Sequence, residues 1–135
     1  MNDRRRPTAA ATISVLAAMP DGGRAREIRT GLSGRGCDVA LIHDGAAVAA
    51  AVRDVRPDVI LLDAGMAFAC REQFVDIAID RAGDRVIPVI IMAAGGPAAG
   101  LVVRHGIHAI VPLASPAEVL HRTIAACLAS FTRAA

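Results

Sequence analysis

The sequence predicts an α/β domain in which helices cover both faces of a parallel sheet. Short apolar segments alternate with helical patterns along the chain, and this alternation is typical of that class. The apolar segment 59–62 contains no polar residue, as expected for a strand buried on both faces. The length of 135 residues suits one domain with a real core, and no apolar run approaches the ~20 residues of a membrane span.

Five segments fit strands because aliphatic and β-branched residues dominate each one. They are residues 12–18, 37–42, 57–63, 86–92 (interrupted only by Pro88) and 107–111. Right-handed crossovers leave few ways to order five parallel strands. We therefore expect a five-stranded parallel sheet in the order 2-1-3-4-5, which is the flavodoxin-like (βα)5 three-layer sandwich.

Helical patterns fill the intervals between these strands. Residues 24–33 carry a stripe of Ala25, Ile28 and Leu32, and an Ala-rich helix that ends near Val55 carries Val48, Val52 and Val55. Two further helices are expected over residues 70–82 and 97–105. The last helix begins at residues 115–118, where Ser and Glu have capping-box spacing, and its stripe is Leu120, Ile124, Cys127, Leu128 and Phe131.

Composition excludes several classes of protein. A net charge of +2 with no Trp or Tyr gives no basis for nucleic-acid binding. The three cysteines and four histidines show no metal-binding or disulfide spacing, so we expect reduced thiols and no bound metal. All 15 basic residues are arginine. We expect residues 1–11 to form a flexible tail, residues 12–132 to form the domain, and the location to be cytoplasmic because no signal peptide is evident.

Asp63 is the last residue of the predicted third strand and its only charged residue after the apolar run. An ionised carboxylate needs water, a partner or a metal, so Asp63 should lie at the carboxyl end of that strand. Ligand sites of open α/β sheets form at this edge. The order of the strands then places Asp63 beside the loop that follows Ala18.

Residues 12–130 resemble the receiver domain of bacterial two-component response regulators. The resemblance is carried by residues 57–63 as the third strand with its phospho-accepting aspartate, by residues 87–94 as the fourth strand, and by residues 106–118 as the fifth strand and last helix. It implies that Asp63 is the candidate phospho-acceptor. It also implies an acidic pair after the first strand, a hydroxyl after the fourth and a lysine after the fifth, which together hold Mg²⁺ and a phosphoryl group.

The pocket that this resemblance implies is degenerate. Ala17 and Ala18 match the acidic pair, Ala93 matches the hydroxyl, and Pro112 or Leu113 matches the lysine. The chain has no lysine, so that last loss does not depend on the alignment. We expect no cofactor, and Mg²⁺ stays an open but weakly supported alternative because its affinity follows the number and charge of its ligands.

Several residues near these positions are candidates to replace part of the missing charge. Asp21 is a weak candidate metal ligand, although a helix N-cap is the preferred interpretation. A turn is preferred for His43 and Asp44. Arg85, Arg104 and His105 carry or can carry positive charge, but none ends the fifth strand. The glycine-containing loops at residues 19–23 and 94–97 lack the spacing of a phosphate-binding motif.

Three hypotheses follow. The preferred one is a non-enzymatic, receiver-like signalling protein that binds a histidine kinase, an output protein or a second copy of itself, without depending on phosphorylation. The alternatives are a working atypical phospho-acceptor at Asp63 and a small flavodoxin-like ligand-binding protein or enzyme. In receivers, the face made by helix 4, strand 5 and helix 5 commonly carries output or dimerisation, so Val102, His108 and Arg122 form the candidate interaction surface.

Overall fold

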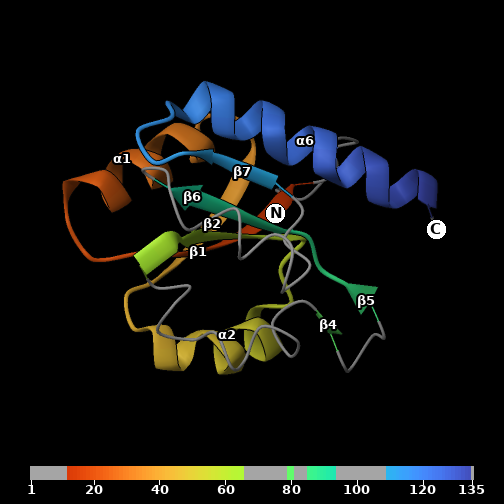
Figure 1. Ribbon diagram of the computed structural model, residues 1–135, viewed down its shortest axis with the longest axis horizontal. Helices are drawn as coiled ribbons and strands as arrows, with labels where there is room; N and C mark the ends of the chain where they lie inside the picture. The colour runs from red at the N-terminus through yellow and green to blue at the C-terminus, as the bar shows by residue number, and fades with distance from the viewer. Residues whose placement is uncertain (1–11, 66–78, 81–84, 94–108, 135) are drawn as a thin grey trace, which may run out of the picture.

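A sheet of five parallel strands forms the centre of the computed structural model, which describes residues 12–65, 79–80, 85–93 and 109–134 (Figure 1). The strands are β1 (Ile13–Ala18), β2 (Cys37–Ile42), β3 (Val59–Asp63), β6 (Val89–Ala93) and β7 (Ala109–Pro112). Their order in the sheet is β2-β1-β3-β6-β7. Numbered along the chain within this sheet, that order is 2-1-3-4-5, which confirms the predicted fold class.

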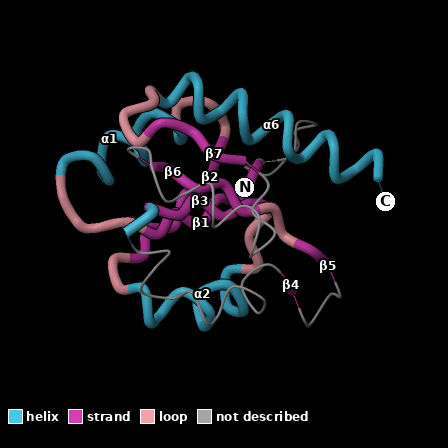
Figure 2. The backbone as a smooth tube through the Cα atoms, in the orientation of Figure 1, coloured by secondary structure: helices cyan, strands magenta, loops and turns pink. Residues whose placement is uncertain are grey.

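Helices lie on both faces of the sheet, so the domain has three layers (Figure 2). Helices α1 (Gly23–Ser33) and α6 (Ala117–Ala134) lie on one face, and α2 (Val48–Val55) lies on the other. A 3₁₀ turn, η2 (Gly45–Ala47), leads into α2. This arrangement follows from the apolar stripes, because Ala25, Ile28 and Leu32 of α1 are buried as predicted.

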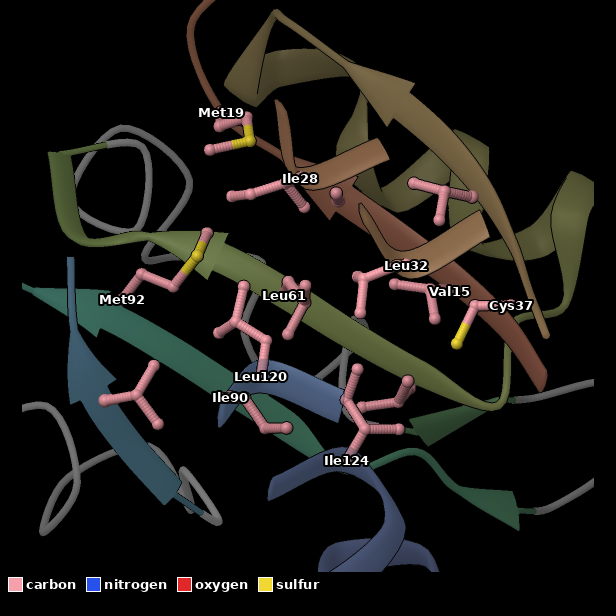
Figure 3. Close-up of a cluster of buried hydrophobic side chains, with 14 of the residues drawn as sticks. Val15, Met19, Ile28, Leu32, Cys37, Leu61, Ile90, Met92, Leu120 and Ile124 are labelled. Atoms are coloured by element: carbon pink, nitrogen blue, oxygen red, sulfur yellow. The ribbon is translucent and has the colours of Figure 1, made fainter. Parts of the chain in front are cut away.

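Each strand sends alternate side chains into two separate cores. Val15 and Ala17 of β1 pack with α1 and α6, whereas Leu16 and Ala18 pack on the α2 side. Figure 3 shows the first core, where Leu61 of β3 lies among residues from both helices and the neighbouring strands. The central strand β3 is thus buried on both faces, with Asp63 as its first partly exposed residue.

Some predicted elements differ in extent from those observed. Pro88 has no backbone N–H to give to the ladder, and β6 begins after it at Val89. A short antiparallel pair, β4 (Ile79–Asp80) with β5 (Arg85–Val86), precedes β6. The helix expected over 70–82 is therefore wrong at its last described residues, because strand pairing takes Ile79 and Asp80. The rest of that helix, and the helix expected over 97–105, lie outside the described residues.

Two predicted helix caps are wrong. The N-cap of α1 is Gly22 rather than Asp21, and no side chain caps that helix. The hydroxyl of Ser115 donates to the carbonyl of Pro112 at 2.7 Å, and Glu118 pairs with Arg122 at 3.5 Å, so no capping box forms. Val55 of the predicted α2 stripe is 38% exposed, because α2 ends there.

Asp58 joins the amino ends of two neighbouring strands. Its backbone N–H donates to the carbonyl of Ser14, and its carboxylate accepts from the Ser14 N–H, each at 2.8 Å. This reciprocal pair aligns β1 with β3 at the edge of the sheet opposite Asp63. The register then places Ala17 beside Leu61 and Ala18 beside Leu62.

Cys37 is buried at the start of β2 and is a free thiol, as predicted. Burial raises the pKa of the Cys37 thiol above its ordinary value, because the thiolate would lose its water. Burial also raises the pKa of the Cys127 thiol on α6. The chain has no Lys and no Tyr, whose side chains would otherwise titrate in the same alkaline range as a thiol.

A raised thiol pKa predicts a loss of stability at alkaline pH. The folded chain keeps the Cys37 proton to a higher pH than the unfolded chain does, so the contribution is fully present at neutral pH and is lost as the pH rises through the ordinary thiol range toward the folded pKa. We expect the free energy of unfolding of Cys37→Ala, measured with urea, to fall less steeply with pH above neutrality than that of the parent chain. Equal slopes for the two proteins would contradict this prediction.

Candidate functional site

The carboxyl end of β3 presents Asp63 at the edge of the sheet. Four buried residues, Val59–Leu62, precede it, and its backbone lies beside Met92 of β6. The Oδ1 atom of Asp63 accepts the N–H of Gly65 at 2.8 Å. The carboxylate therefore caps the helical turn that begins at Ala64, a role that Asp side chains often have at a helix N-terminus.

Alanines lie where the receiver resemblance implies oxygen ligands. Ala17 and Ala18 have no exposed surface, and Ala93 is 6% exposed. Their side chains face opposite cores, with Ala17 on the side of α1 and α6 and with Ala18 and Ala93 on the side of α2. This part of the sheet edge thus offers hydrocarbon, with no acid, base or hydroxyl.

The described residues around Asp63 do not make up a complete magnesium site. Mg²⁺ requires near-octahedral oxygen coordination and is usually held by carboxylates. Asp63 contributes one carboxylate, one oxygen of which already accepts the Gly65 N–H. Among the residues that the structure describes, no three His, Cys, Asp or Glu side chains are grouped to bind a metal.

Asp21 faces the end of β2. Its Oδ1 lies 3.7 Å from Nε2 of His43, and Nδ1 of the same ring lies 2.9 Å from the Met19 carbonyl. A carbonyl can only accept, so Nδ1 carries the proton of this hydrogen bond. Asp44, as expected, makes a turn, with Oδ1 accepting the Ala46 N–H at 3.0 Å. This cluster ties the β1–α1 loop to β2.

Leu113, which with Pro112 is a candidate match for the lysine, makes backbone hydrogen bonds to two other parts of the fold. Its N–H donates to the Ala93 carbonyl at 2.9 Å, and its carbonyl accepts Nη2 of Arg24 at 2.7 Å. A cation does therefore approach this loop, but it comes from α1 and binds main chain. Arg24 is not predicted as a site residue by the sequence, because the periodicity of α1 places it off the apolar stripe, where it has the pattern of a surface residue.

The candidate interaction surface is described in part. Arg122 lies on α6, largely exposed, beside Glu118. A shallow groove of about 450 Å³ runs along α6 and β7, and its described lining residues are Ala109, Val119, Arg122, Thr123, Ala126 and Cys127. Val102 and His108 lie outside the described residues, as do Arg104, His105 and the loop 94–97. Arg85 belongs to β5.

The fold matches solved structures, although no protein-family model and no curated protein matches the sequence. The receiver domain of the sensor histidine kinase PA1611 from Pseudomonas aeruginosa superimposes with a TM-score of 0.73 at 17% identity, over 88% of this chain and 99% of that one. That structure holds a magnesium ion in its active-site cleft.

Two further structures show the same relationship. A response regulator receiver protein from Burkholderia phymatum has a TM-score of 0.69 at 22% identity, over 87% of this chain and 96% of its own. The pseudo-receiver domain of CikA has a TM-score of 0.65 at 16% identity, over 87% and 98%. This chain has the fold of the response-regulator receiver domain.

The turn at Asp63 predicts different effects for two substitutions. Asp63→Asn keeps an oxygen that can accept the Gly65 N–H, so its free energy of unfolding should stay within about 0.5 kcal/mol of the parent value. Asp63→Ala removes the acceptor and should lower it by about 1 kcal/mol. Urea unfolding of both variants measures the difference, and an Asn variant as unstable as the Ala variant would argue against the turn.

Proposed function

We propose that this chain is a receiver-like signalling protein of a two-component or phosphorelay system. It acts mainly through protein–protein interaction that does not depend on phosphorylation. The observation that supports the proposal is the burial of Ala17, Ala18 and Ala93 at this edge of the sheet. The receiver resemblance matches these three alanines with the acidic pair and the hydroxyl.

The chemistry of phosphoryl transfer explains why these alanines matter. A carboxylate that attacks an anionic phosphoryl group needs cations and hydrogen-bond donors to neutralise the charge that gathers in the transition state. Neither Ala17 nor Ala18 has a carboxylate that could join Asp63 in holding such an ion. Leu113 supplies no side-chain charge at the lysine position. The surroundings of Asp63 therefore support a degenerate pocket.

Protein partners fit this interpretation better than a small substrate does. The proposed partner is a histidine kinase, an output protein or a second copy of the chain. The proposed contact surface contains Arg122 and the groove along α6 and β7, together with Val102 and His108. We propose a cytoplasmic location. No helix in the described part of the chain is long and apolar enough to cross a membrane.

A functional atypical phospho-acceptor is the second candidate. The observation that favours it is the position of Asp63, which is partly exposed at the carboxyl end of β3. Phosphorylation in this case would have to proceed without the acidic pair. The further alternative of a flavodoxin-like ligand-binding protein has no observation of its own among the described residues.

Partner capture with and without a phosphoryl donor separates the first two candidates. The immobilised chain and its Asp63→Asn variant are exposed to extract from the source cells, with acetyl phosphate and Mg²⁺ or without them, and the retained proteins are identified by mass spectrometry. We expect the same two-component proteins in all four samples, with recoveries within about twofold, because a bound partner contacts a surface that is already formed.

The opposite result is equally specific. A partner that appears only with acetyl phosphate, and is lost in Asp63→Asn, would establish the phospho-acceptor and overturn the proposal. Sedimentation of the isolated chain, carried out in parallel, shows whether a second copy is itself the partner.

A further inference from the structure

Arg24 joins the start of α1 to the loop between β7 and α6. Its Nη2 donates to two main-chain carbonyls of that loop, at 2.7 Å to Leu113 and 2.6 Å to Ser115. Its Nη1 lies 3.3 Å from Oε1 of Glu27, one turn further along α1. Hydrogen bonds from a charged donor are roughly twice as strong as neutral ones, so this contact can fix a loop.

The loop is also bonded within itself and to the sheet. The Pro112 carbonyl accepts both the backbone N–H of Ser115, at 3.0 Å, and its hydroxyl, at 2.7 Å. The Leu113 N–H reaches the Ala93 carbonyl of β6. Pro112 and Pro116 bracket the loop with fixed φ angles. The Leu113 and Ser115 carbonyls complete this network by accepting from Arg24.

The side chain of Arg24 is held in a conformation that donates to the carbonyls of Leu113 and Ser115. It is 30% exposed, and its Nε is buried with no hydrogen-bond partner in the described structure. A buried donor without a partner is unfavourable, so the conformation is held by the bonds that Nη2 makes. The two helices also pack closely, because a methyl group on Gly31 of α1 would overlap the Cβ of Ala117 at the start of α6.

We propose that Arg24 is a positioning residue that holds the β7–α6 loop and the first turn of α6 in one conformation, whatever the state of Asp63. Leu113 is one of the two residues that match the receivers' lysine in the sequence comparison, and its carbonyl accepts from Arg24. This inference rests on the proposed function, because an interaction surface that needs no phosphorylation must already be formed in the free chain.

Hydrogen exchange of the intact chain tests the proposal without any partner. Arg24→Met keeps much of the apolar stem and removes every donor. We expect about tenfold faster exchange at the amides of Leu113, Ser115, Val119 and Leu120, all of which have partners in or beside the loop. The amides of Arg56 and Asp58, bonded in other parts of the fold, should keep their rates.

Matched variants make the result specific. Arg26→Met changes an exposed arginine of the same helix and should leave all of these rates unchanged. Arg24→Lys keeps one nitrogen that can donate to both carbonyls, so it should loosen the same four amides by a smaller factor. If Arg24→Met does not fold, the pattern in Arg24→Lys decides. Asp63→Asn should leave the loop amides unchanged.

Three results would overturn the proposal: unchanged loop amides in Arg24→Met, an equal loss of protection at the loop and at Arg56 and Asp58, or selective loosening of the loop in Asp63→Asn. Failure of the proposed function would be seen separately, in partner capture that depends on phosphorylation. A loop held by Arg24 in a chain that nevertheless needs phosphorylation is therefore a distinguishable outcome.

Discussion

The burial of β3 is the constraint on which the rest of the structure depends. This strand is hydrogen-bonded to β1 on one side and to β6 on the other, and both of its faces lie in apolar cores. A strand with neither face in contact with solvent cannot carry a charged side chain while it lies within the core. Asp63 is the residue at which β3 leaves the core. The parallel register then fixes what surrounds that carboxylate, because the carboxyl ends of neighbouring strands meet at one edge.

The side chains at the carboxyl edge of the sheet are the basis for the function that we propose. Ala17 and Ala18 extend the core to the end of β1, and Ala93 does the same for β6. The charged groups nearby make structural contacts instead, with Asp21 beside His43 and Arg24 on the β7–α6 loop. The receiver fold is therefore present, and the charged side chains of Asp21 and Arg24 contact neighbouring loops of that fold.

Local patterns were enough to predict the sheet order and the position of Asp63. Apolar runs identify buried strands, and the alternation of strands with helices leaves few topologies. They failed where the deciding partner is distant in sequence. Ser14 and Asp58 are 44 residues apart, and Arg24 and Leu113 are 89 residues apart, so no window of sequence contains both members of either pair.

Local motifs also misled where other contacts close in the sequence compete with them. Ser115 and Glu118 have capping-box spacing, yet the hydroxyl of Ser115 donates to the Pro112 carbonyl, and the Ser115 carbonyl accepts from Arg24. Helical periodicity was expected to continue through Ile79 and Asp80, which instead pair as β4 with β5. In each of these cases a partner a few residues away, and not the helical pattern, decided the structure.

The function that we propose requires that the edge around Asp63 binds neither a magnesium ion nor a phosphoryl group. Amide NMR of the chain during titration with Mg²⁺, and then with beryllofluoride, tests this claim most directly. The account predicts no saturable shift at Met19, Asp63 or Gly65, and spectra that respond no more than those of Asp63→Asn. Saturable shifts at these amides that vanish in Asp63→Asn would contradict it.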